Sequence, residues 1–388
     1  MTADSASALA ARREKLVGAA RRIVVKVGSG VLSGGGHAEV NAQIMAEIAR
    51  QVSAIASGGR HVALVSSGSV ALGTRILGIP RHGLSIPVKQ AAAALGQGSL
   101  ISLWAQSFLK HEHKVGQVLL THDDLRDRRR FLNARNTLNS LLDFGVIPVI
   151  NENDTVSVDE IKFGDNDTLS ARVTNLIEAD LLVILSDVEG LYTADPRLDP
   201  SARKLDYVEE VDENILSMAG DSSSTTGLGG MASKARAAGE AARFGAPTII
   251  LPGMKQGVLL DAMEGPSTAG TFFFPHEDRL DSKRHWIEYT LVPAGKIQVD
   301  DGARDAIVNK GRSLLASGIT AVEGEFEDGD AVSIAGPDGK VFAKGLINYP
   351  VHEVEKIMGR HSSLIETILG YKTYDEVAHR NDMVVYGE

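Results

Sequence analysis

Two lysines in this chain of 388 residues stand beside glycine-rich turns, a setting typical of phosphate binding. Lys26 lies in the apolar run VVKVGSG at residues 24–30, and Lys234 follows a polar, glycine-rich stretch at residues 221–233. Glycine lets backbone N–H groups approach a phosphate, and a lysine ammonium group adds positive charge. Each segment can also be an ordinary loop with a solvated lysine. The sequence favours phosphate binding at Lys234, whereas the Lys26 segment alone is weak support for it.

Asparagine and aspartate form a third polar cluster, in VIPVINENDTVS (146–157) and GDNDTLSA (164–171). An asparagine amide both donates and accepts hydrogen bonds, so it can recognise a carboxylate and an amine together. The alternative is an Asx-rich loop followed by a capped helix. We favour a functional site because the cluster directly follows an apolar run, although the spacing of a calcium-binding loop is not met. The cluster comprises Asn151, Asn153, Asp154, Asp165, Asn166 and Asp167.

Two further turns also follow apolar runs. In VSSGSVALG (65–73), Ser67 and Gly68 stand where a strand gives way to a helix, so this turn either caps the helix or contacts a ligand. In SDVEGLYTADPR (186–197), Asp187 precedes a turn-rich loop that suits a nucleotide base or ribose and equally suits a plain connection.

Composition excludes several kinds of chemistry. The chain has no cysteine, which excludes thiolate nucleophiles, disulfides and Cys-ligated zinc. The P-loop and Rossmann patterns and the H-R-D motif of protein kinases are absent, and no Ser-His-Asp arrangement is recognisable. The net charge of −10 disfavours generic nucleic-acid binding. Phosphoryl transfer fits the remaining residues best, because it needs positioning and charge neutralisation more than covalent chemistry.

Apolar runs alternate with helical patterns over the first two-thirds of the chain. The runs are short and rich in Val, Ile and Leu, which is typical of buried parallel strands. This alternation predicts an α/β fold with a doubly wound, mostly parallel sheet, whose ligands bind beyond the carboxyl ends of the strands. Strands are predicted at 22–27, 61–66, 115–120, 146–151, 181–186 and 247–252, and helices at 41–57, 87–110, 125–144 and 165–179.

The regular alternation of apolar runs and helical patterns ends at about residue 270. We expect an exposed lead-in helix over 1–20, a catalytic domain over 21–270, a linker over 271–284 and a smaller β-rich domain over 285–388. In the last of these, a Pro-Asp-Gly turn at 337–339 predicts a hairpin. No apolar stretch approaches the length needed to span a bilayer and no signal peptide is recognisable, so the cytoplasm is the expected compartment.

Seven motifs resemble those of one family. The segments VVKVGSG, VSSGSVALG, FLNARNT, PVINENDTVS, FGDNDTLSA, SDVEGLYTADPR and GLGGMASK are similar, in this order, to motifs of the glutamate 5-kinases in the amino-acid-kinase family. The resemblance spans nearly the whole chain, and the tail from about residue 285 resembles the PUA domain appended to many of these enzymes. One departure is Gly30, where many relatives carry a hydroxyl residue.

The resemblance implies ATP-dependent phosphorylation of the γ-carboxylate of L-glutamate, the first step of proline biosynthesis, with ATP and Mg²⁺ as cofactors and proline as an inhibitor. It implies catalytic roles for Lys26, Asp167 and Lys234. It implies substrate binding by Ser67, Gly68, Asn151, Asn153, Asp154 and Asn166. It implies ATP binding by Lys26, Gly28, Ser29, Ser186, Asp187, Leu228, Gly229, Gly230, Met231, Ala232, Ser233 and Lys234, and it leaves metal ligands unassigned.

Two other functions compete with this one. The first is a kinase of the same fold that acts on another small carboxylate, such as N-acetylglutamate; those kinases usually show K-x-G-G where this chain reads KVGS at 26–29. The second is an RNA-associated PUA protein. Residues 285–388 contain 10 Lys and Arg against 17 Asp and Glu, a net of −7, which disfavours a surface that tracks phosphates. We also expect a homo-oligomer and no membrane partner.

Overall fold

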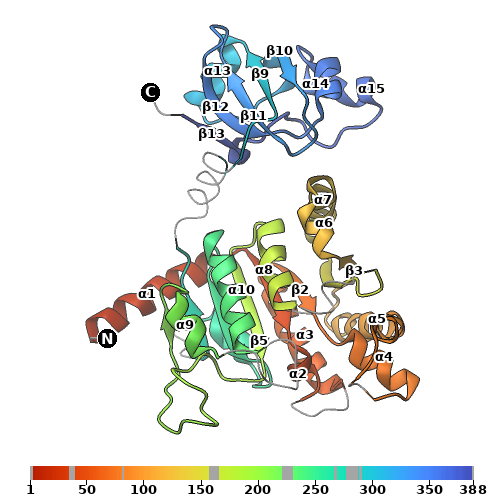
Figure 1. The fold of residues 1–388 in the computed structure, drawn as a ribbon, viewed down its shortest axis with the longest axis vertical. Helices are drawn as coiled ribbons and strands as arrows, with labels where there is room; N and C mark the ends of the chain where they lie inside the picture. The colour runs from red at the N-terminus through yellow and green to blue at the C-terminus, as the bar shows by residue number, and fades with distance from the viewer. Residues whose placement is uncertain are drawn as a thin grey trace. The chain divides into compact units, whose positions relative to one another are not determined.

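The computed structural model describes residues 3–34, 40–80, 83–156, 166–220, 230–265, 269–276, 287 and 291–386 (Figure 1). The chain divides into two compact units, Met1–Arg126 with Asn133–Glu277 and Asp127–Leu132 with Asp278–Glu388. Each unit is described by itself. Among the described residues, no helix is both long and apolar enough to cross a membrane.

An eight-stranded sheet forms the centre of the first unit, in the order β3-β4-β2-β1-β5-β7-β8-β6. Every neighbouring pair is parallel except β7 with β8, so the predicted doubly wound, mostly parallel sheet is confirmed. Four predicted strands match the observed bounds, and two begin one residue later. The strands are β1 (Arg22–Val27), β2 (His61–Ser66), β3 (Val115–Leu120), β4 (Ile147–Glu152), β5 (Leu181–Ser186), β6 (Tyr207–Val208), β7 (Thr248–Pro252) and β8 (Thr271–Phe273).

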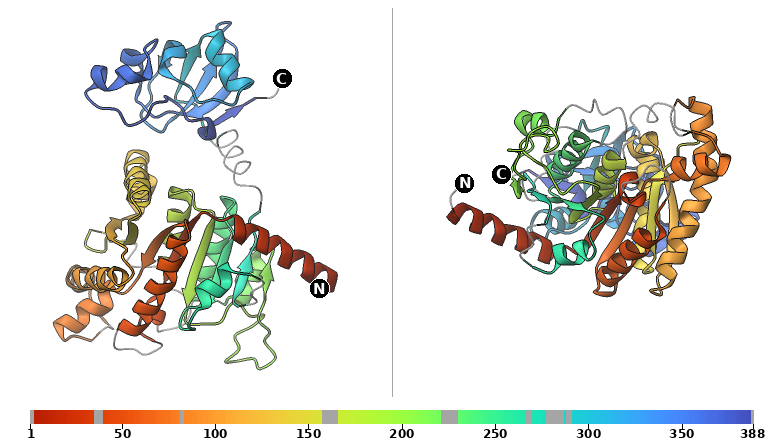
Figure 2. Two further views of the ribbon diagram at one scale, coloured as in Figure 1. Left: turned by 180° about the vertical axis from the view of Figure 1, so that it is seen from behind. Right: turned by 90° about the horizontal axis from the view of Figure 1, so that it is seen from below.

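Helices cover both faces of this sheet, as the opposite views in Figures 1 and 2 show. Alternate residues of a strand point to opposite faces. Ile23, Val25 and Val27 of β1 belong to the core cluster formed with α1, α3, α5 and α11, whereas Lys26 points the other way, toward α8. The helices are α1 (Ala3–Ala19), α2 (Ser29–Leu32), α3 (Ala42–Ser57), α4 (Ser69–Leu77), α5 (Ile86–Leu109), α6 (His122–Arg126), α7 (Arg128–Asp143), α8 (Asn166–Leu176), α9 (Glu213–Met218), α10 (Met231–Arg243) and α11 (Val258–Met263).

The N-terminal helix is not the exposed lead-in that the sequence suggested. Helix α1 buries Leu9, Arg13 and Val17 against the first unit. The Arg13 guanidinium group donates hydrogen bonds to the carbonyls of Ala262 and Gly265, 3.1 and 3.0 Å away. The sequence did not show an apolar stripe on this helix, because one of the three buried positions is an arginine and small or charged residues surround them.

The first residues of the predicted linker, 271–276, belong to the first unit instead. Thr271–Phe273 forms strand β8, which pairs antiparallel with β7 and parallel with β6. The Phe272 and Phe274 rings meet edge to face with centroids 4.8 Å apart and are almost completely buried. The phenylalanine run is therefore core, and the remainder of the predicted linker, 277–284, lies outside the described residues.

The second unit contains a five-stranded sheet in the order β10-β9-β11-β12-β13. The predicted β-rich domain and its hairpin are confirmed, since β11 and β12 pair antiparallel on either side of the Pro-Asp-Gly turn. The sheet packs with short helices on its own apolar core. Its elements are β9 (Gly295–Val299), α13 (Asp301–Val308), β10 (Ile319–Gly324), β11 (Ala331–Ala335), β12 (Val341–Leu346), α14 (Val351–Ile357), α15 (Ile365–Leu369) and β13 (Met383–Val385).

Candidate functional site

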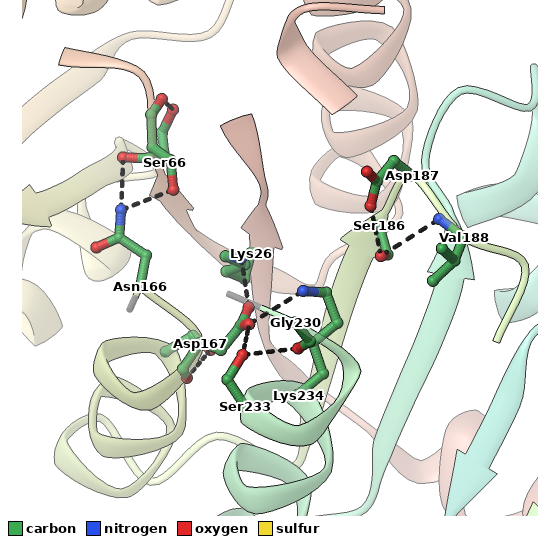
Figure 3. Close-up of polar contacts among 12 residues, drawn as sticks. Lys26, Ser66, Asn166, Asp167, Ser186, Asp187, Val188, Gly230, Ser233 and Lys234 are labelled. Atoms are coloured by element: carbon green, nitrogen blue, oxygen red, sulfur yellow. Dashed lines mark hydrogen bonds and ion pairs between the residues drawn. The ribbon is translucent and has the colours of Figure 1, made fainter. Parts of the chain in front are cut away.

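Two buried lysines share one buried aspartate (Figure 3). Lys26 comes from the central strand β1, Asp167 from the first turn of α8 and Lys234 from the first turns of α10. Lys26 forms an ion pair with Asp167 Oδ1, and Lys234 Nζ lies 3.2 Å from Asp167 Oδ2. The structure thus brings together the three residues for which the sequence implied catalytic roles.

The electrostatics of this trio favour an anionic ligand. Burial of Asp167 by itself disfavours its charged form, but the two neighbouring ammonium groups outweigh that effect and hold the pKa of this carboxyl well below its usual range. With all three groups ionised, the trio taken by itself carries a net positive charge. The trio is poorly solvated, and attraction for a phosphoryl group is stronger in such a place than in water.

The start of α10 adds backbone donors beside the lysines. Gly230 is the N-cap, and Ser233 Oγ lies 2.9 Å from the Gly230 carbonyl and 2.7 Å from Asp167 Oδ2. Met231 and Ala232 complete the first turn, whose N–H groups have no partner inside the helix and can bind phosphate. Leu228 and Gly229, for which the sequence implied the same role, lie outside the described residues.

An amide network lies on the other side of Asp167. Asn166 Nδ2 donates to Ser67 Oγ at 2.8 Å and to Asn151 Oδ1 at 2.9 Å. Asn151 Nδ2 in turn donates to Gln97 Oε1 at 2.8 Å and lies 3.3 Å from Ser69 Oγ. Strands β2 and β4 and helices α4, α5 and α8 therefore meet through polar side chains at the carboxyl ends of the strands.

A partly buried carboxyl group ends this network. Ser69 Oγ donates to Asp154 Oδ2 at 3.1 Å. Burial raises the pKa of Asp154, and the hydrogen bond from Ser69 offsets only part of that rise. Among the described residues no cation offsets that rise, so an ionised Asp154 would gain from an ammonium group on a ligand.

Two polar atoms of the network retain unused hydrogen-bonding capacity. Asn166 Oδ1 and Gln97 Nε2 are buried and have no hydrogen-bond partner among the described residues. Buried polar atoms are normally paired, so such atoms call for an explanation. Together they offer an acceptor and a donor, which suits a ligand that carries both an amine and a carboxylate.

Sequence reasoning missed Gln97, and it offered Ser69, in the motif VSSGSVALG, only as a helix cap or a ligand contact. They meet because α4 and α5 cross at glycines: a Cβ added to Gly73 would lie 1.6 Å from the Ala92 carbonyl oxygen, and one added to Gly96 would lie 1.8 Å from that of Ser69. Only glycine permits this approach. The run of small residues around Gly96 was the available signal, but small residues are common in helices.

Other expected site residues lie outside this network. Asn153 Oδ1 accepts from Thr155 Oγ1 at 2.6 Å within a local turn, although the Asn153 backbone follows β4 directly. Gly68 is the N-cap of α4, with a φ of +116° that glycine adopts without strain. Ser186 Oγ donates to Asp187 Oδ1 at 3.3 Å at the end of β5 (Figure 3).

The loop after β1 lies close to the loop after β5. Gly28 is the N-cap of α2, and Ser29 is the first residue of that short helix. A Cβ added to Gly30 would lie 2.8 Å from Asp187 Oδ2, so a larger residue here would require the Asp187 side chain to shift. Among the described residues, no group of three or more His, Asp or Glu side chains could hold a metal ion.

Comparisons with known proteins agree with this geometry. The amino acid kinase family matches residues 21–252, and the PUA domain family matches residues 295–369. The glutamate 5-kinase of Syntrophotalea carbinolica is 51% identical over 373 residues, covering 96% of this chain and 99% of that protein. The glutamate 5-kinase of Geobacter sulfurreducens is 50% identical over 373 residues, covering 96% of this chain and 100% of that protein.

Proposed function

The chain belongs to the amino acid kinase family, and from that premise we propose that it transfers the terminal phosphoryl group of ATP to the side-chain carboxylate of L-glutamate. The products are glutamyl 5-phosphate and ADP, and the reaction opens proline biosynthesis. The observation that carries this proposal is the buried Lys26–Asp167–Lys234 trio beside an amide network with unused donor and acceptor atoms.

The chemistry needs charge neutralisation rather than a general base. The glutamate γ-carboxylate has a reference pKa of about 4.3, so it is already ionised at neutral pH. One of its oxygens forms a bond to the γ-phosphorus as the bond to the β,γ-bridging oxygen breaks, and ADP leaves with that electron pair. Two anions must approach for this to happen. We assign Lys26 and Lys234 to the transferring phosphoryl group and Asp167 to holding both ammonium groups in place.

The amide network is assigned to the amino-acid end of glutamate. Asp154 and Asn166 Oδ1 are suited to accept hydrogen bonds from the α-ammonium group, because Asp154 is a partly buried carboxyl group and Asn166 Oδ1 is a buried acceptor with no donor among the described residues. Ser67 and Asn151 hold Asn166 in position through its own amide group. We retain Gly68 and Asn153 as neighbours of this pocket.

The nucleotide is assigned to the other side of the lysines. The first turn of α10 supplies N–H groups to the phosphates, and the loops that begin at Gly28 and Ser186 bound the same edge of the sheet. We propose Mg–ATP as the substrate form, in which the phosphates themselves ligate the metal ion.

We further propose that proline inhibits the enzyme, that the chain forms a homo-oligomer and that it works in the cytoplasm, where its substrates are. Proline carries the same carboxylate and amine as the amino-acid end of glutamate, so the same donors and acceptors can hold it.

Trapping of the acyl phosphate tests the proposed reaction. Purified protein is incubated with Mg–ATP, hydroxylamine and either L-glutamate, N-acetylglutamate or aspartate. We expect a hydroxamate with glutamate and little with the other two, because N-acetylation removes the ammonium group. Hydroxamate formed only from N-acetylglutamate would contradict the pocket assignment and leave the fold and the lysines intact.

A further inference from the structure

A tryptophan in the core reaches the turn that presents Ser67. Trp104 of α5 is completely buried, and its indole Nε1–H donates to Ser66 Oγ at 2.8 Å. Ser66 is the last residue of β2 and is itself completely buried. Its hydroxyl donates onward to the Ser67 carbonyl at 3.1 Å.

Asn166 also contacts this serine pair, and Figure 3 shows its amide group facing Ser66. Asn166 Nδ2 lies 2.8 Å from Ser67 Oγ and 3.5 Å from the Ser66 carbonyl oxygen. The conformation of residues 66–67 is therefore fixed between a core donor and an amide of the candidate glutamate site.

The choice of tryptophan at this position is informative. The Trp104 ring packs beside Phe108 with centroids 5.8 Å apart, and that contact makes no use of the indole N–H. An indole N–H is a donor with no acceptor capacity, and when buried it needs a partner. Here that partner is a serine one residue from the site.

We propose that Trp104 is a positioning residue for amino-acid binding, acting through Ser66 to orient Ser67 and Asn166. The inference rests on the proposed function, because the bound amino acid is the glutamate assigned there. Helix α5 also carries Gln97, two turns before Trp104, which bonds Asn151. One rigid helix thus sets two sides of the same network.

A double-mutant cycle on KM tests this proposal. Trp104→Phe keeps an aromatic ring, although a smaller one that leaves a cavity, and removes the donor; Ser66→Ala removes its partner. We expect each single change to raise the KM for glutamate about fivefold, with kcat and the KM for ATP within about twofold of wild type. Because the two groups act as a unit, the double variant should show the effect of one change rather than the product of both.

Phe108→Leu is the matched control, since Phe108 packs on Trp104 from the same helix but bonds no site residue. It should lower stability and leave the KM for glutamate unchanged.

Two results would overturn the proposal. One is an unchanged KM for glutamate in both single variants while the wild type is active. The other is a double variant whose effect on KM is the product of the two single effects. If Trp104→Phe does not fold, Ser66→Ala alone decides, since a normal KM there also overturns it. An inactive wild type would instead count against the proposed function.

Discussion

At the scale of single residues, the proposed chemistry depends on a charge imbalance. Asp167 satisfies two lysines at once, so the trio retains one positive charge where a phosphoryl group would sit. The sequence pointed to all three residues through their motifs, and the family resemblance implied that Asp167 organises the two lysines, with which the ion pairs agree. The local pattern by itself does not link a strand lysine to an aspartate about 140 residues later.

The first prediction concerns the lysine on α10. Lys234→Met should lower kcat by about 10²–10³ and change the KM for glutamate little, because it removes charge that acts mainly in the transition state. Steady-state assays at saturating ATP measure this. Lys255→Met is the control, since Lys255 is exposed and should tolerate the change. Near-normal turnover of Lys234→Met would remove this lysine from the mechanism.

The second prediction separates binding from catalysis. Asn166→Ala should raise the KM for glutamate at least tenfold with a smaller change in kcat, because it removes the acceptor and both bonds that orient Ser67 and Asn151. Titration of glutamate at fixed ATP measures the effect. Asn214→Ala on the exposed face of α9 should behave like wild type. An unaltered KM would exclude Asn166 from the pocket.

The third prediction concerns pH. Burial raises the pKa of Asp154, so this group takes up a proton at a higher pH than an exposed aspartate does. Protonation removes the negative partner of the substrate ammonium group. The KM for glutamate should therefore rise as pH falls below neutrality toward the usual aspartate range. Asp154→Asn should give a high KM with little dependence on pH in that window. An equal slope in both proteins would assign the titration to another group.

At the scale of elements, the strands were the most predictable part. Except in the edge strand β3, their Val-, Ile- and Leu-rich runs are largely buried on both faces, and that pattern is visible without tertiary information. The docking of α1 through Arg13 and the pairing of Thr271–Phe273 as β8 were not visible, because both depend on surfaces contributed by distant segments. The crossing of α4 and α5 was missed for the same reason.

The fourth prediction tests that crossing. A methyl group at Gly96 would collide with the Ser69 carbonyl, so Gly96→Ala should destabilise the protein by about 1–3 kcal/mol or more and raise the KM for glutamate. Gly98→Ala, two residues further along α5, has open space and should be neutral or slightly stabilising. Urea unfolding and glutamate titration measure both. Equal behaviour of the two variants would show that the close approach does not position the site.

At the scale of the whole molecule, the described site residues all belong to the first unit, and each unit has its own apolar core. A chain that ends at residue 277 should therefore retain glutamate-dependent turnover within about tenfold of the full chain. Hydroxamate formation by the truncated protein measures this. Loss of turnover in a truncated protein that still unfolds cooperatively would give the second unit a part in catalysis.

Isotope transfer tests the central claim most directly. L-glutamate labelled with ¹⁸O in its γ-carboxylate is incubated with Mg–ATP and the full-length protein. Glutamyl phosphate cyclises when the α-amine attacks the γ-carbonyl, and it releases phosphate that keeps the oxygen joined to phosphorus. We predict one ¹⁸O atom in each phosphate released, seen as an isotope shift in ³¹P NMR. Unlabelled phosphate would mean that water accepts the phosphoryl group, and this would contradict the account.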